Sequence, residues 1–65
     1  MSSLQMADQL VAMWLEDRKQ ACQWVHLNCE GPRRVLDALE RAAFYEDQTS
    51  IQLRESFIQA LMETA

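Results

Sequence analysis

Apolar residues recur with helical spacing through the first part of the chain. Between residues 4 and 28 no glycine, proline or run of β-branched residues interrupts the pattern. Projected at about 100° per residue, these apolar positions form two adjacent bands, whereas a single core face needs only one. The pattern predicts one long amphipathic helix over about residues 4–28. Its first band holds Leu4, Ala7, Val11, Trp14, Leu15, Cys22 and Val25. Its second band holds Met6, Leu10, Met13 and Trp24.

A glycine–proline pair separates this helix from the next one. Gly31 and Pro32 are the only glycine and the only proline of the sequence. Glycine is favoured just past a helix end because it takes a positive φ without a Cβ clash. Proline is favoured at the first helical position, where its missing N–H costs nothing. We therefore expect a tight corner, followed by a second helix over about residues 32–46.

A polar stretch over residues 47–50 predicts a second break. Thr49 and Gln52 have the spacing of a capping box, in which each side chain bonds the other residue's backbone N–H. A third helix is expected over about residues 50–63, and no stretch alternates for long enough to be a strand. The predicted fold is all-α, a three-helix bundle forming one domain over residues 1–65. The third helix carries its apolar face on Leu53, Phe57, Ile58 and Leu61.

The apolar content is high for so short a chain. The sequence has 65 residues, of which 49% are hydrophobic, and a domain of about this size buries only about 60% of its unfolded surface. At about 1.5 Å per residue, the long helix extends past two partners of about 15 residues each. We expect its first turns, with Met6, Leu10 and Met13, to stay uncovered and to form an interface. The alternative is that these residues fill the domain's own core through a kink or tilt of the helix.

Two arginines add to this candidate interface. Arg18 and Arg54 project to the middle of apolar faces, where a charge is costly unless it is paired. Candidate partners are Asp17, Glu46 and Asp47, or a carboxylate on another chain. An arginine beside an aromatic side chain is typical of an interaction hot spot. The alternative is that both arginines bury their stems and keep their heads in water. The predicted partner-binding residues are Met6, Leu10, Met13, Arg18, Trp24 and Arg54.

Two aromatic residues do not fit the apolar face of the second helix. Phe44 and Tyr45 project away from its stripe. Either the helix loosens there and the rings turn inward, or they form an exposed aromatic pair.

The charge and the termini limit the partners to be expected. Ten acidic and six basic residues give a net charge of −4, which disfavours binding to nucleic acid or to an anionic membrane. No run of about 18 apolar residues is present to span a membrane. The first residues lack the basic segment of a signal peptide, and Asp8 interrupts the apolar stretch that follows. With only two cysteines, we expect a cytoplasmic protein whose thiols stay reduced.

Metal binding and catalysis have weak support. Cys22, His26 and Cys29 have the only metal-like spacing. On a straight helix the two cysteines lie roughly 10.5 Å apart along the axis, too far for one zinc ion or an unstrained disulfide. Paired carboxylates along the chain are sequence neighbours, so their side chains splay apart. We expect no enzyme activity, no metal, no cofactor and no small-molecule substrate.

These patterns favour a small acidic protein that works by occupying the surface of another protein through its first helix. Inhibitors, antitoxins, secretion chaperones and regulatory adaptors are of this kind. The partner is a different protein, a second copy in a homodimer, or both. The alternative is a structural or docking subunit of a larger assembly.

Overall fold

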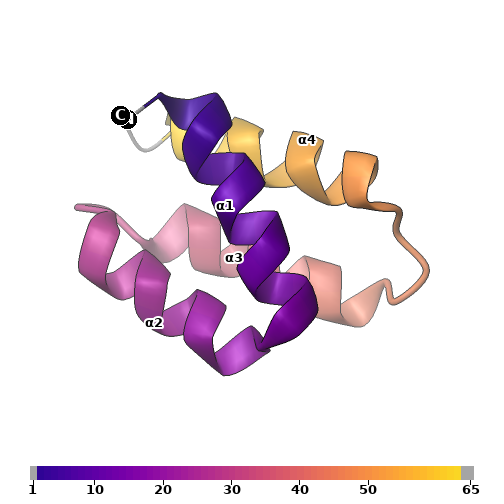
Figure 1. The fold of residues 1–65 in the computed structure, drawn as a ribbon. Coiled ribbons are helices and arrows are strands. Elements are labelled where there is room, and N and C mark those ends of the chain that lie inside the picture. The colour runs from indigo at the N-terminus through magenta and orange to yellow at the C-terminus, as the bar shows by residue number, and fades with distance from the viewer. Residues whose placement is uncertain (1, 64–65) are drawn as a thin grey trace.

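The computed structural model describes residues 2–63, and its secondary structure over that range is entirely helical. The helices are α1 (Ser3–Glu16), α2 (Arg18–Asn28), α3 (Arg33–Phe44) and α4 (Ser50–Glu63), as Figure 1 shows. The all-α prediction is confirmed, and the bounds expected for the last two helices agree with α3 and α4 to within two residues. The prediction of three helices is wrong, because the expected long helix is two helices. None of the helices within residues 2–63 is long and apolar enough to cross a membrane.

The break between α1 and α2 is made by Asp17. Its backbone is extended, with φ −154° and ψ 107°, and its N–H donates to the carbonyl of Met13 at 2.7 Å. Its carboxylate accepts from the backbone N–H groups of Lys19 at 3.1 Å and Gln20 at 3.4 Å. Asp17 therefore ends α1 and caps α2 at once, a position for which aspartate is a favoured residue. The chain turns sharply there, at the lower edge of Figure 1.

Two other helices begin with reciprocal capping boxes. The Thr49 hydroxyl accepts from the N–H of Gln52 at 3.2 Å, and the Gln52 amide oxygen accepts from the N–H of Thr49 at 2.9 Å. This capping box at the start of α4 confirms the prediction. Ser2 and Gln5 make the same pair of bonds at the start of α1. Both boxes satisfy backbone donors that a helix leaves unpaired in its first turn.

The corner between α2 and α3 differs from the expected form. Gly31 does not have a positive φ, so the left-handed glycine cap predicted there is wrong. Instead α2 ends at Cys29, whose extended backbone N–H donates to the carbonyl of Val25 at 3.0 Å. Pro32 has helical angles, φ −73° and ψ −10°, and its carbonyl accepts from the N–H of Leu36 at 2.8 Å. The extended residue at position 29 thus ends the helix without a left-handed turn.

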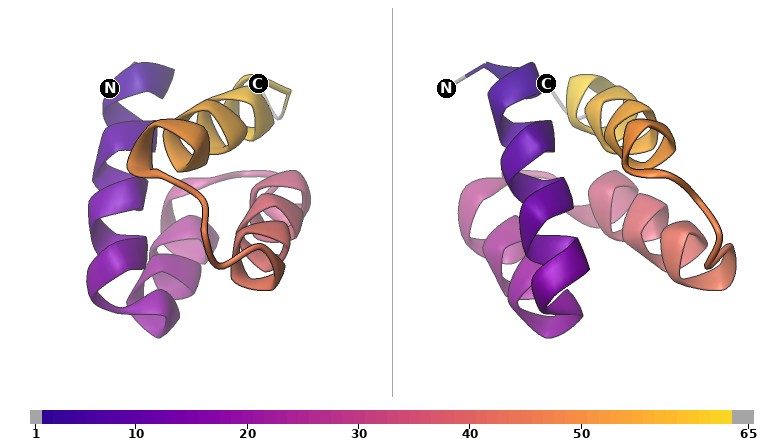
Figure 2. Two further views of the ribbon diagram at one scale, coloured as in Figure 1. Left: turned by 90° about the vertical axis from the view of Figure 1, so that its right-hand side faces the viewer. Right: turned by 45° about the vertical axis from the view of Figure 1, so that its right-hand side comes forward.

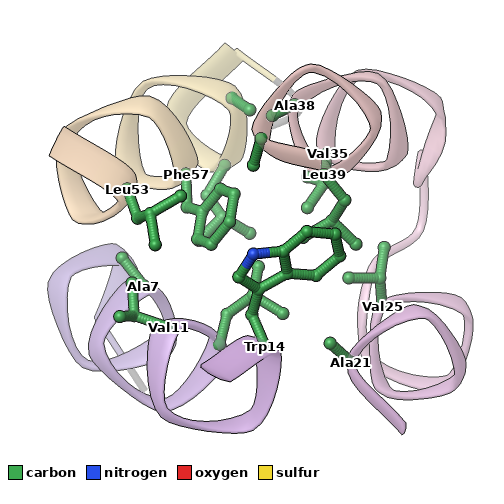
Figure 3. Packing of buried hydrophobic residues seen from close by; sticks show 14 residues of the cluster. Ala7, Val11, Trp14, Ala21, Val25, Val35, Ala38, Leu39, Leu53 and Phe57 are labelled. Carbon is green, nitrogen blue, oxygen red and sulfur yellow. The ribbon is translucent and has the colours of Figure 1, made fainter. Parts of the chain in front are cut away.

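The four helices form a ring around one apolar core. α1 packs on α4, α4 on α3, α3 on α2 and α2 on α1, while the diagonal pairs make no close backbone contact. Figure 3 shows Trp14 in the middle of this ring, and its indole meets the Phe57 ring edge-on with centroids 6.3 Å apart. Trp14 of the first apolar band is thus buried in the core. The buried apolar residues are Ala7, Leu10, Val11, Trp14, Ala21, Val25, Val35, Ala38, Leu39, Ala42, Leu53, Phe57, Ala60 and Leu61.

The first turns of α1 do not project beyond the rest of the molecule. α4 packs across them, as both views of Figure 2 show, and Asp8 of α1 lies 3.6 Å from Arg54 of α4. Leu10 on the same helix is fully buried. The expected overhang is wrong, because α1 ends at Glu16 and its first half is the part that α4 covers. The alternative, that these residues fill the domain's own core after a kink, describes Leu10 correctly.

Candidate protein-interaction surface

The residues predicted to bind a partner do not form one exposed band. Leu10 has no exposed surface, so the expectation that it faces a partner is wrong. Its side chain is part of the apolar core. Met6, Met13 and Trp24 are half-buried and pack against the core. They therefore present only part of their apolar surface to the outside.

Arg18 and Arg54 both keep their charged groups at the surface. The guanidinium carbon of Arg18 lies 4.8 Å from the centre of the Trp14 ring, a cation–π contact that covers the outer side of the core tryptophan. The Arg54 guanidinium lies 3.6 Å from the carboxylate of Asp8, and these side chains are 50% and 54% exposed. Both arginines are exposed residues, so neither places an unpaired charge in the core. Asp8 was not among the carboxylates anticipated from the sequence.

The large apolar side chains that the structure leaves exposed lie elsewhere. Most of them are single aliphatic residues, which are normal on a protein surface. Phe44 and Tyr45 are different, because they are adjacent aromatic residues that are 80% and 56% exposed. The second alternative for these residues, an exposed aromatic pair, is therefore confirmed. The full set of exposed large apolar residues is Leu4, Leu15, Leu27, Phe44, Tyr45, Ile51 and Met62.

The end of α3 holds the two rings against each other. Phe44 is the last helical residue, and Tyr45 leaves the helical path with φ −103° and ψ 84° while its N–H donates to the carbonyl of Arg41 at 3.1 Å. The ring centres are 5.1 Å apart and the planes are inclined at 75°. Such an edge-to-face arrangement is favourable for aromatic pairs. Because the rings contact each other and not the core, both remain available to a partner.

A shallow hollow lies beside the aromatic pair. Asp37, Glu40, Arg41, Phe44 and Tyr45 line it, and its volume is about 480 Å³. We call these five residues the aromatic surface. On α3 the first four are spaced so that they share one side of the helix, because residues three, four and seven apart are neighbours there.

A second, more polar hollow adjoins the aromatic surface. It has a volume of about 210 Å³, lies between α3 and α4, and shares Asp37 and Arg41 with the first hollow. At its edge Arg34 forms an exposed ion pair with Glu63 at 3.1 Å. Arg41, by contrast, has no ion-pair or hydrogen-bond partner for its guanidinium within residues 2–63. It is therefore free to pair with a group of a bound partner.

The candidate metal ligands named from the sequence do not converge. Among residues 2–63 no group of three or more histidine, cysteine, aspartate or glutamate residues is close enough together to hold a metal ion. Cys22 and Cys29 are half-buried free thiols, and His26 is exposed. Burial raises the pKa of the Cys29 thiol above its ordinary value of 9.0. Cys29 thus stays protonated near neutral pH, a poor state for a nucleophile.

Sequence reasoning identified Phe44 and Tyr45 as misplaced aromatics but missed the rest of the aromatic surface. The helical spacing of the residues that precede Phe44 could have identified them. Arg41, Glu40 and Asp37 precede it by three, four and seven residues, so they belong to its face of the helix.

Comparisons with known proteins found no match. No family model matches this sequence, no curated protein matches it, and no solved structure matches it.

Proposed function

We propose that this chain is a small non-catalytic module that binds another protein through the aromatic surface at the end of α3. The observation that carries the proposal is the exposure of Phe44 and Tyr45, at 80% and 56%. The core around Trp14 is filled without them, so the fold does not use their apolar area. Burying a large apolar side chain contributes about 1.5–3 kcal/mol. A partner that covered both rings would therefore gain roughly 2–5 kcal/mol from these two side chains.

The surrounding residues support the same function. Aromatic residues and arginine are enriched at the centre of protein interfaces, and polar residues surround them. Arg41, with its unpaired guanidinium, lies beside the rings, and Asp37 and Glu40 line the same hollow. Aromatic side chains also lose little conformational entropy on binding, because they have few rotatable bonds. This combination is typical of a binding hot spot.

A contact between two copies through α1 is a separate proposal. Leu4 and Leu15 are exposed on this helix, Met6 and Met13 keep part of their surface, and Arg18 lies over Trp14. These groups are more scattered than the aromatic surface. We therefore assign the heteromeric contact to the end of α3 and keep α1 as the candidate face for a homodimer.

Site-specific photocrosslinking in the source cells tests the main proposal. A photoreactive phenylalanine analogue would replace Phe44, and in a matched control it would replace Leu27, which is 83% exposed on α2. We expect a discrete adduct heavier than the 7.6 kDa chain from position 44 and not from position 27. Adding Tyr45→Ala should reduce that adduct strongly. Equal adducts from both positions, or no adduct from position 44, would refute the proposal.

A further inference from the structure

The negative charge of this protein is concentrated around the aromatic surface. Residues 37–47 contain four carboxylates and one arginine, a net charge of −3 out of −4 for the whole chain. All four carboxylates belong to exposed residues. The remainder of the chain is close to neutral. The acidic residues of this segment are Asp37, Glu40, Glu46 and Asp47.

The aromatic rings add to the attraction for a cation. The face of an aromatic ring carries partial negative charge, so a guanidinium or ammonium group within about 6 Å of its centre is attracted. Phe44 and Tyr45 are inclined at 75° to each other, so they present faces in two directions. Arg18 already makes such a contact with Trp14, where α1 ends and α2 begins. At the aromatic surface no cation of the described chain lies over a ring.

We propose that the aromatic surface binds a cationic segment of a partner protein. The inference rests on the proposed function and names the chemistry of the partner. Arginine or lysine side chains of that segment lie over Phe44 and Tyr45 and pair with the carboxylates of residues 37–47. Its apolar side chains cover the remaining ring edges in the hollow beside Arg41.

A second copy of this chain is a poor occupant of the same surface. A two-fold symmetric contact brings each patch against itself. Here it would place a segment of charge −3 against another of charge −3, and like charges across an interface are strongly unfavourable. Nucleic acid is excluded for the same reason. A cationic polypeptide satisfies the rings and the carboxylates together.

Titration of the ¹⁵N-labelled protein with synthetic peptides tests this inference. The probe is an amphipathic peptide of about 12 residues with leucine on one face and arginine on the other, and its matched control carries glutamate in place of arginine. We expect the arginine peptide to shift the backbone amide resonances of residues 37–47, and the glutamate peptide to leave them unchanged. Raising the salt concentration from about 50 to about 500 mM should weaken the arginine peptide's binding, because exposed charges are screened.

Matched variants separate specific binding from general attraction to an acidic protein. Glu40→Gln with Asp47→Asn should weaken binding of the arginine peptide about tenfold, the effect of losing two exposed charge pairs. Glu16→Gln with Glu30→Gln removes the same charge outside residues 37–47 and should leave binding unchanged. Phe44→Ala with Tyr45→Ala should also weaken binding while the circular dichroism spectrum stays the same.

The outcomes distinguish this inference from the proposed function. Equal binding of both peptides at residues 37–47 would overturn the cationic partner and leave the interaction surface intact. Equal weakening by the Glu16/Glu30 variant, or full binding without the two rings, would reduce the effect to general electrostatics and overturn the inference. No shift with either peptide would overturn it as well. The crosslinking at position 44 decides the proposed function independently, because it does not depend on the charge of the partner.

Discussion

Leu10→Ala should be strongly destabilising, because Leu10 belongs to the apolar core enclosed by the four helices. Its side chain has no exposed surface. Truncating a fully buried leucine to alanine costs about 2–5 kcal/mol, from lost burial and from the cavity left behind. At about 0.05–0.15 kcal/mol per residue, a domain of this length is stable by only about 3–10 kcal/mol. The substitution should therefore remove a large part of the free energy of unfolding.

The measurement is urea unfolding followed by far-UV circular dichroism, with Leu15→Ala as the matched control. Leu15 lies on the same helix and undergoes the same truncation, but its side chain is 64% exposed. We expect the control to change the free energy of unfolding by about 0.5 kcal/mol or less. Thermal unfolding should agree, since each kcal/mol shifts the Tm of a small domain by about 4–8 °C. Leu10→Ala should thus lower the Tm by about 10 °C or more.

Two results would refute this reasoning. Equal effects of Leu10→Ala and Leu15→Ala would mean that Leu10 is no more buried than Leu15. Full stability of Leu10→Ala together with loss of association would mean that Leu10 faces a partner, as the apolar pattern alone predicted. Leu10→Glu sharpens the comparison, because an unpaired charge in the core should unfold the chain outright.

Three further predictions concern the break at Asp17, the Cys29 thiol and self-association. Asp17→Ala should lower the free energy of unfolding by about 1 kcal/mol in urea titrations, because the cap of α2 is lost, and Asp17→Asn should cost less; equal stability of all three chains would contradict the cap. Because burial raises the pKa of Cys29 in the folded protein, the thiol ionises at a lower pH in the unfolded chain than in the folded one. Stability should therefore be full below pH 9 and should fall as the pH rises through the folded pKa of Cys29, whereas Cys29→Ala should lack this part of the decline. Sedimentation at micromolar concentration should give twice the mass of 7.6 kDa if copies pair through α1; a monomer with a cooperative melt would rule out that homodimer.

Local sequence was enough to predict the all-helical structure and the bounds of the last two helices to within two residues. Periodic apolar positions and the absence of alternation indicate helices without knowledge of the tertiary contacts. The capping box of Thr49 and Gln52 involves only four consecutive residues, so its geometry is set locally. The break at Asp17 also had a local signal, since Asp17 and Gln20 have the spacing of a capping motif within a polar stretch. An uninterrupted helix satisfied the apolar spacing equally well, and the sequence pattern did not distinguish the two.

Tertiary structure decided between a straight and a broken first helix. With the break at Asp17, α2 packs against α1 and α3. This packing leaves Ala21 and Val25 without any exposed surface. A straight helix would carry these residues away from the ring of helices around Trp14. The area buried by folding back offsets the backbone hydrogen bonds lost at the break.

Tertiary structure also decided which apolar residues remain outside. Leu10 and Leu15 are the same residue type on one helix, and helical projection places both on apolar bands. The packing of the other helices around α1 buries the former and leaves the latter exposed. In the same way, the sequence showed that Phe44 and Tyr45 lie off the stripe of α3, but their exposure depends on where that helix ends. Periodicity determines which residues share a face, whereas coverage of that face depends on the neighbouring helices, which come from distant parts of the chain.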